Sequence, residues 1–214
     1  MLQHVYERAV EARYLHSTII ATDDPRIYEI GRSFGARVRM TRPDHVSGTD
    51  RVDEAASSEN AAIVVNIQAD EPLIDPQAID AAILPLAQDS EIVMGTLKKR
   101  IEDAREITDP NVVKVVTNRA GDAIYFSRCP IPSVRGGDER PLPGGRGSGG
   151  DRWGSGAAAI HFKHIGMYVY RSDFLMSYPG LPIGPLEQTE RLEQLRAIEN
   201  GYKIRVVETD YESV

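Results

Sequence analysis

Residues 61–67 constrain the fold more than any other part of the chain. They form a nearly continuous run of Ala, Ile and Val, AAIVVNI, that gives way to polar residues. A short run of this kind is typical of a strand with both faces covered, as in a parallel sheet between helices. Asp75–Pro76 then opens a helix through Ala87, and Glu91–Leu97 is the next strand. Strand, helix and strand in this order predict an α/β fold.

The rest of the chain continues this alternation and adds an antiparallel part. Val112–Thr117 and Ala123–Ser127 flank Asn118–Gly121 and predict a hairpin. A long strand is expected at His161–Arg171 and a last one at Lys203–Glu208. We therefore expect a mixed, mostly parallel sheet flanked by helices. The length of 214 residues favours a single domain over residues 1–214.

Charge and cysteine content limit the class of protein. The 25 Lys and Arg against 32 Asp and Glu give a net charge of −7, which argues against a nucleic acid or an anionic membrane as partner. Apolar runs such as residues 61–67 are far too short to span a bilayer. Cys129 is the single cysteine, so no disulfide forms within one chain. A reducing compartment follows, and we expect a cytoplasmic protein.

Glycine is concentrated in one segment. Nine of the 18 glycines lie between Gly136 and Gly156. Such a composition does not offset the entropy of ordering it, so residues 134–160 predict a mobile loop. A lid over a substrate is the alternative, because unusually long loops are often functional.

Polar residues cluster directly after the buried strand, at Asn66–Pro72. Ligands of open α/β sheets bind outside the carboxyl ends of strands. The carboxylate of Asp70 is suited to Mg²⁺, which takes few protein oxygens together with substrate phosphates. Asp70 is equally suited to cap the following turn, and the two interpretations have about equal weight.

A second cluster, Thr41–Arg51, leads into a helix. Ser47, Gly48 and Thr49 offer hydroxyl and backbone donors at the helix N-terminus, which suits an anion or a base edge. Arg42 adds a fork of donors. An ordinary N-cap at Ser47 or Thr49, with Arg42 in solvent, is the simpler interpretation.

Two further groups stand out near the C-terminus. His164 and Tyr168 are four residues apart on the predicted strand, so they share a face. They either contact one ligand or belong to a half-buried strand. The predicted helix Leu186–Asn200 places Glu193 beside its buried face and Gln194 further round, where solvated side chains are the default.

Taken together, these segments resemble the 3-deoxy-manno-octulosonate cytidylyltransferases, also called CMP-Kdo synthetases. The matching pieces occur in the family order and cover most of the chain. They are LQHVYERA (Leu2–Ala9), IIATDD (Ile19–Asp24), MTRPDHVSGTDR (Met40–Arg51), VVNIQADEP (Val64–Pro72), NVVKVV (Asn111–Val116), AIYFSRCPIP (Ala123–Pro132), HIGMYVYR (His164–Arg171) and PLEQTERLEQLRAIENGYKI (Pro185–Ile204).

The resemblance implies a nucleotide-diphospho-sugar transferase-like, Rossmann-like fold and a reaction. The anomeric hydroxyl of Kdo attacks the α-phosphorus of CTP, which gives CMP-Kdo for lipopolysaccharide synthesis and releases pyrophosphate. Asp70 matches the catalytic carboxylate that binds Mg²⁺, and a homodimer is implied. The positions matching CTP-binding residues are Arg42, His45, Ser47 and Gly48. The positions matching Kdo-binding residues are Gln68, Arg128, His164, Tyr168, Glu193 and Gln194.

The two ends of the chain depart from the family pattern. The family's first strand with its phosphate-binding loop, and a C-terminal segment that supplies a second Mg²⁺ ligand, have no counterpart in the sequence. We therefore expect the 214 residues alone to be weakly active or inactive. One alternative is a related sugar-acid cytidylyltransferase of the CMP-sialate synthetase type. The other is an inactive truncated fragment or ligand-binding remnant.

Overall fold

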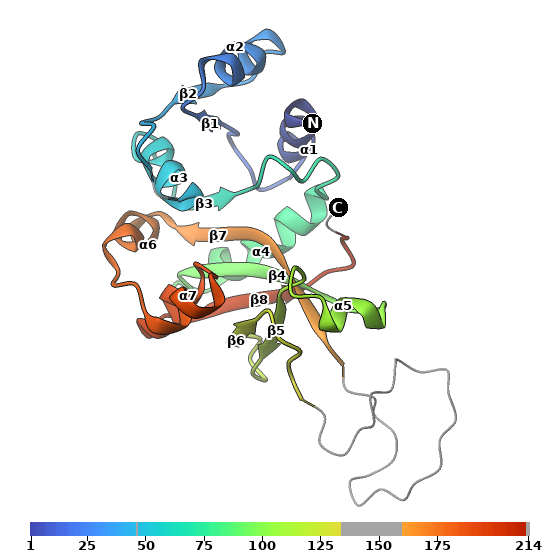
Figure 1. Ribbon diagram of the computed structural model, residues 1–214. Helices are drawn as coiled ribbons and strands as arrows, with labels where there is room; N and C mark the ends of the chain where they lie inside the picture. Colours follow the sequence, from blue (N-terminus) through green and yellow to red (C-terminus); the bar gives the residue numbers. More distant parts are fainter. Residues whose placement is uncertain (46, 134–159, 213–214) are drawn as a thin grey trace, which may run out of the picture.

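The computed structural model describes residues 1–45, 47–133 and 160–212 (Figure 1). Apart from its last residue, the loop predicted over residues 134–160 lies outside this part of the chain. The strands of the main sheet are β3 (Ile63–Asn66), β4 (Met94–Arg100), β5 (Lys114–Thr117), β6 (Ala123–Ser127), β7 (Phe162–Arg171) and β8 (Ile204–Glu208). The order is β6-β5-β7-β4-β8, and β3 also pairs with β7.

The directions of these strands correct the expectation of a mostly parallel sheet. Four of the five described pairings among these strands are antiparallel, and only β4·β8 is parallel. The helical crossover α4 (Pro76–Gln88) does make β3 and β4 run the same way. However, β7 inserts between them in the opposite direction, so each pairs with an antiparallel neighbour. The α/β class is confirmed and the sheet is mixed.

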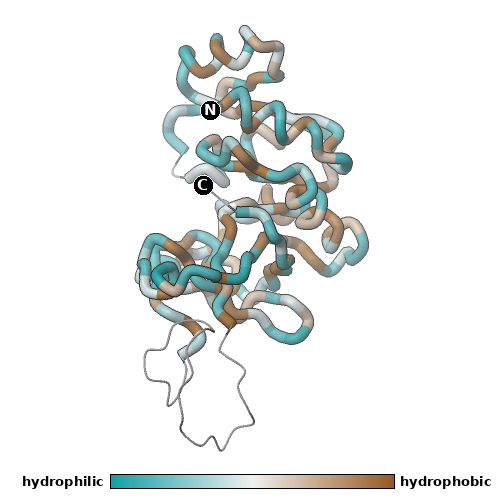
Figure 2. The backbone as a smooth tube through the Cα atoms, turned by 90° about the vertical axis from the view of Figure 1, so that its right-hand side faces the viewer, coloured by the Kyte–Doolittle hydropathy of each residue, from teal (hydrophilic) through white to brown (hydrophobic). Residues whose placement is uncertain are grey.

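A smaller unit lies at one end of the molecule, at the top of Figures 1 and 2. It consists of two short parallel strands, β1 (Ile20–Thr22) and β2 (Val38–Met40), joined by α2 (Pro25–Ser33). Asp24 caps α2 by accepting a hydrogen bond from the backbone of Arg26, and Pro25 occupies the first turn. The helix leaves the side chains of Ile27 and Ile30 exposed, and Figure 2 shows its hydrophobic stretches in brown.

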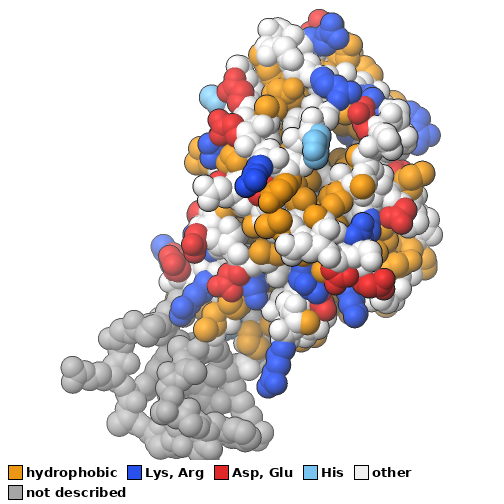
Figure 3. All heavy atoms as spheres, turned by 180° about the vertical axis from the view of Figure 1, so that it is seen from behind, with side chains coloured by type: hydrophobic (Ala, Val, Ile, Leu, Met, Phe, Trp, Pro, Cys, Tyr) orange, Lys and Arg blue, Asp and Glu red, His pale blue; other side chains and the backbone are white. Residues whose placement is uncertain are grey.

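The remaining helices cover the main sheet or extend from its edges. They are α1 (Leu2–Val10), α3 (Gly48–Ala56), α5 (Ala104–Thr108), α6 (Ser172–Ser177), the 3₁₀ helix η1 (Tyr178–Gly180), α7 (Pro185–Glu190) and α8 (Leu195–Glu199). None of the helices in the described ranges has the length and apolar character that a membrane crossing needs. On the face turned away in Figure 1, acidic and basic side chains are interspersed around hydrophobic ones (Figure 3).

Alternation along β7 divides the interior into two layers. Ile165, Met167 and Val169 belong to the hydrophobic cluster under α1 and α4. Tyr170 belongs to the opposite cluster, with α6, η1 and α8. Because side chains alternate along a strand, His164 and Tyr168 lie on the same face as Tyr170. The sheet therefore presents this pair on the side of α6–α8, away from α4.

Candidate active site

The first group of site residues follows β3. Asp70 lies exposed in the turn after this strand, and no described residue donates a hydrogen bond to its carboxylate. Its neighbour Glu71 accepts a hydrogen bond of 2.7 Å from the hydroxyl of Tyr211, which follows β8. Burial raises the pKa of Tyr211, so the phenol remains a donor. The strands β3, β4 and β8 run the same way, and their carboxyl ends therefore share one edge of the sheet.

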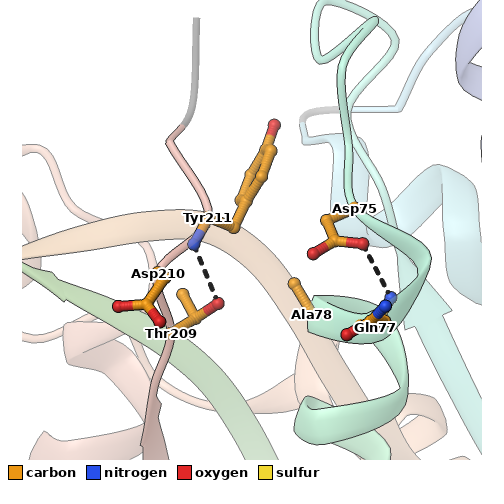
Figure 4. A pocket seen from close by; sticks show the side chains of 6 residues that line it. All are labelled: Asp75, Gln77, Ala78, Thr209, Asp210 and Tyr211. Carbon is orange, nitrogen blue, oxygen red and sulfur yellow. Dashed lines mark hydrogen bonds between the residues drawn. The ribbon is translucent and has the colours of Figure 1, made fainter.

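A polar pocket of about 280 Å³ lies beside this edge, between the start of α4 and the segment after β8 (Figure 4). Its lining residues are Asp75, Gln77, Ala78, Thr209, Asp210 and Tyr211. Asp75 caps α4 by accepting from the backbone of Gln77 at 3.0 Å. The backbone N–H of Tyr211 donates to the Thr209 hydroxyl at 3.1 Å. Sequence reasoning missed Tyr211, whose partner Glu71 lies 140 residues away.

Arg42 and His45 are both bound by one carboxylate of α3. Glu54 accepts hydrogen bonds from the backbone of Arg42 at 3.2 Å and from His45 Nε2. The guanidinium Nε of Arg42 lies 3.4 Å from the same carboxylate. Burial raises the pKa of Glu54, but the hydrogen bonds from His45 and Arg42 outweigh this and lower it overall. The ionised carboxylate of Glu54 therefore holds the segment before α3 in place. No local motif in the sequence had indicated this role.

The N-terminus of α3 contacts the turn between α7 and α8. Ser47 caps α3 in a capping box with Asp50. Its hydroxyl also lies 3.3 Å from Oε1 of Glu193, while the hydroxyl of Thr49 lies 3.2 Å from Oε2. The structure thus joins two clusters that are far apart in the sequence.

His164 and Tyr168 lie side by side on β7, with ring centroids 5.3 Å apart. The hydroxyl of Thr96 donates its single proton to the carbonyl of Met167 at 2.7 Å, so His164 Nε2–H donates to Thr96 Oγ1 at 2.9 Å. Burial lowers the pKa of His164 to about 3 and raises that of Tyr168. His164 is therefore neutral, with Nδ1 left as an acceptor.

Arg128 is held at three points after β6. Its backbone N–H donates to the Glu190 carboxylate at 2.9 Å, and its Nε donates to the Glu190 carbonyl at 2.9 Å. Its Nη1 donates to the carbonyl of Pro110 at 2.9 Å. Beneath it, the fully buried Lys114 donates to the carbonyl of Arg128 at 2.6 Å. One guanidinium nitrogen, Nη2, has no hydrogen-bond partner among the described residues.

The predicted helix Leu186–Asn200 is interrupted, and this corrects the sequence analysis. Arg191 has φ 54° and ψ 48°, which ends α7 in the left-handed region. Glu193 and Gln194 consequently lie in a turn before α8, not on a continuous helical face. Gln194 is only 4% exposed, and its Nε2 is buried without a partner among the described residues.

The structure brings several of the predicted site residues into contact, but not all. Ser47 meets Glu193, and His164 meets Tyr168. Gln68 and Asp70 are exposed after β3, and no described hydrogen bond joins them to the other groups. The described residues contain no cluster of three or more His, Cys, Asp or Glu suited to a metal.

Comparisons with known proteins show the family of the chain. The family model described as cytidylyltransferase matches residues 1–204. The 3-deoxy-manno-octulosonate cytidylyltransferase of Solibacter usitatus is 67% identical over 214 residues, which are 100% of this chain and 78% of that protein. The chain belongs to the 3-deoxy-manno-octulosonate cytidylyltransferase family. The family's member from Syntrophotalea carbinolica is 51% identical over 98% of this chain and 80% of its own length.

A solved structure supports the same family. It is a CMP:2-keto-3-deoxy-manno-octonic acid synthetase complexed with CTP. Its TM-score is 0.86 at 38% identity, covering 100% of this chain and 81% of that one. The expected cytidylyltransferase fold is therefore confirmed. The segments expected to be missing at the two ends remain a prediction, because the relatives are compared only over the part that this chain spans.

Proposed function

We propose that this protein, as a member of its family, transfers the cytidylyl group of CTP to Kdo and releases pyrophosphate. The carrying observation is the 67% identity, over the full chain, to a 3-deoxy-manno-octulosonate cytidylyltransferase. The solved synthetase with bound CTP supports CTP as the nucleotide. Kdo is favoured over sialic acid because both relatives are named as cytidylyltransferases of 3-deoxy-manno-octulosonate, which is Kdo. These relatives offer no support for an inactive remnant, nor for the expectation that the 214 residues alone are weakly active or inactive.

The proposed Kdo pocket lies on the α6–α8 side of β7. Arg128 pairs with the sugar carboxylate through its remaining guanidinium nitrogen, since charge-assisted hydrogen bonds of this type are strong. His164 Nδ1 accepts a hydrogen bond from a sugar hydroxyl, and the unpartnered amide of Gln194 donates one to the sugar. The remaining members of the proposed pocket are Gln68, Tyr168 and Glu193.

The proposed cytidine site is the segment before α3 together with the start of that helix. Ser47 and Gly48 place polar groups at a helix N-terminus, which favours hydrogen bonds to a base edge or an anion. Glu54 holds Arg42 and His45 beside it. The bonds between the start of α3 and Glu193 connect this segment to the sugar-acid pocket.

Mg²⁺ is the proposed cofactor, and Asp70 is the residue that would hold it. The fit rests on donor chemistry: Asp70 is an exposed carboxylate that no described residue engages, and it lies at the carboxyl edge of the sheet. Mg²⁺ suits such a site because it takes one or two carboxylates together with substrate phosphates. When bound, the ion supplies neutralisation of phosphate charge. Asp70 and its turn orient the reacting groups.

Assembly and location complete the proposal. A homodimer is proposed from the resemblance, and sedimentation at several protein concentrations tests it. The cytoplasm is proposed as the place of action, in keeping with the single cysteine, Cys129, which forms no disulfide within one chain.

Pyrophosphate release with CTP, Mg²⁺ and a panel of Kdo, sialic acid and other sugar acids tests the function. Turnover with Kdo and little with sialic acid is expected. Asp70→Asn should lower kcat by about 10²–10³, as loss of one charge-stabilising group typically does. Glu29→Gln, at another exposed carboxylate without a described hydrogen bond, is the matched control. Turnover with sialic acid alone, or CTP binding without any turnover, would overturn the proposal.

A further inference from the structure

Both oxygens of Glu193 are bound by the first turn of α3. Thr49 Oγ1 lies 3.2 Å from Oε2, and Ser47 Oγ lies 3.3 Å from Oε1. The donors precede the acceptor by 144 and 146 residues. The carboxylate therefore connects two segments that are far apart in the sequence.

The hydroxyl of Thr49 interacts with two side chains, the carboxylate of Glu193 and the phenol of Tyr170. In helices, Thr hydroxyls often donate to a carbonyl one turn earlier. Here the hydroxyl is turned to Glu193, and the residue is only 4% exposed. Ser47 differs, because its oxygen also accepts from the backbone of Asp50 at 3.1 Å as the N-cap. Thr49 is thus the one of the two whose hydroxyl takes no part in capping α3.

We infer that Thr49 is a positioning residue, which fixes the Glu193 carboxylate for the sugar acid. This inference rests on the proposed function, because it takes Glu193 as a Kdo contact. A carboxylate oxygen has two lone pairs, so each oxygen of Glu193 retains acceptor capacity while held. In this role Thr49 acts on the sugar acid through Glu193.

The surroundings of Glu193 make its protonation sensitive to Thr49. Burial raises the pKa of Glu193, and the hydrogen bonds from Thr49 and Ser47 together with the charge of Arg196 lower it. The titratable and charged groups that face Glu193 are Asp50 of α3, Tyr168 and Tyr170 of β7, Tyr178 of η1 and Arg196 of α8. Removing the Thr49 hydroxyl therefore raises the pKa of Glu193 further. The acid limb of kcat/KM for Kdo should move to higher pH.

Steady-state kinetics on Thr49→Val tests the inference, because Val keeps the shape and removes the hydroxyl. The KM for Kdo should rise about tenfold, while the KM for CTP stays within about twofold. Thr49→Ser should restore the KM for Kdo. If the Val variant folds poorly, Thr49→Ala is compared with Thr49→Ser, because these two variants also differ only in the hydroxyl.

A double-mutant cycle shows whether Thr49 acts through Glu193. Thr49→Val should add nothing to Glu193→Gln in the KM for Kdo. Equal KM values for Thr49→Ser and Thr49→Ala, or additive effects in the cycle, would overturn the inference alone. If Glu193→Gln leaves the KM for Kdo unchanged, the proposed role of Glu193 fails, and the inference with it. These two failures are distinguishable in the same set of variants.

Discussion

Glu187 of α7 and Arg196 of α8 form a two-pronged ion pair, with Nε–Oε2 and Nη2–Oε1 distances of 2.9 and 2.6 Å. Their side chains are only 11% and 10% exposed, respectively. The guanidinium also lies over the ring of Tyr178 at 5.2 Å. The pair closes the base of the turn that carries Glu193 and Gln194, so the shape of this turn depends on it.

Arg196→Met should destabilise the protein strongly. The substitution leaves the Glu187 carboxylate buried without its partner, which typically costs about 3–5 kcal/mol. Urea unfolding measures the change in the free energy of unfolding. The double variant Glu187→Leu with Arg196→Met should recover most of the loss, because it removes both charges.

Arg105→Met is the matched control for this prediction. Arg105 pairs with Asp103 at 2.6 Å, but its side chain is 90% exposed. Exposed pairs contribute little, so no measurable change in stability is expected there. Equal effects of the Arg196 and Arg105 substitutions would contradict the role assigned to the buried pair.

Arg191 should tolerate Gly better than a β-branched residue. Its φ of 54° lies in the left-handed region, which costs a residue with a Cβ about 1–2 kcal/mol. Arg191→Val should therefore be less stable than Arg191→Gly by about that amount, measured by thermal or urea unfolding. The control is the same pair of substitutions at Arg119, which is exposed and does not have a positive φ. A smaller difference at Arg191 than at Arg119 would show that the backbone relaxes.

The sequence predicted what local chemistry determines. Asp24–Pro25 and Asp75–Pro76 each marked a helix start, because cap and proline act within one turn. The residues of β6 and the face shared by His164 and Tyr168 also followed from local pattern.

Long-range pairing explains what the sequence did not predict. Insertion of β7 between β3 and β4 depends on contacts about 60–110 residues apart, so the prediction of a mostly parallel sheet was wrong. The break at Arg191 carries no glycine signal, and the predicted helix therefore ran through it. The Thr49–Glu193 contact is likewise invisible to local motifs.

His164 should make stability depend on pH in a defined window. Its folded pKa of about 3 lies below the ordinary 6.5, so the unfolded chain binds a proton between these values and the folded chain does not. Stability due to neutral His164 is therefore complete above pH 6.5 and is lost as pH falls towards 3. The expected slope from this group is about 1.4 kcal/mol per pH unit.

The comparison of wild type with His164→Gln isolates this effect, since Gln keeps a donor for Thr96. The difference in unfolding free energy between the two proteins should be constant above neutral pH and change steadily on acidification. Urea midpoints measured from pH 8 to about 4 provide the curve. Parallel curves throughout would contradict a depressed pKa for His164.

Lys114→Met should lower both stability and the affinity for Kdo. The buried ammonium donates to the carbonyls of Asp109, Val112 and Arg128 at 2.8, 2.6 and 2.6 Å, respectively. Burial lowers the pKa of Lys114, yet these three acceptors suit the charged form. Removing the ammonium leaves these buried carbonyls without their donor, which should cost about 2–3 kcal/mol.

One of the three carbonyls belongs to Arg128. Without its donor, the proposed contact between Arg128 and the sugar carboxylate loosens, and the KM for Kdo should rise. The exposed Lys203→Met is the control, expected to change neither quantity. If Lys114→Met kept normal stability but raised the KM for Kdo, the lysine would serve binding and not the fold. If neither the stability nor the KM changed, the prediction would be contradicted.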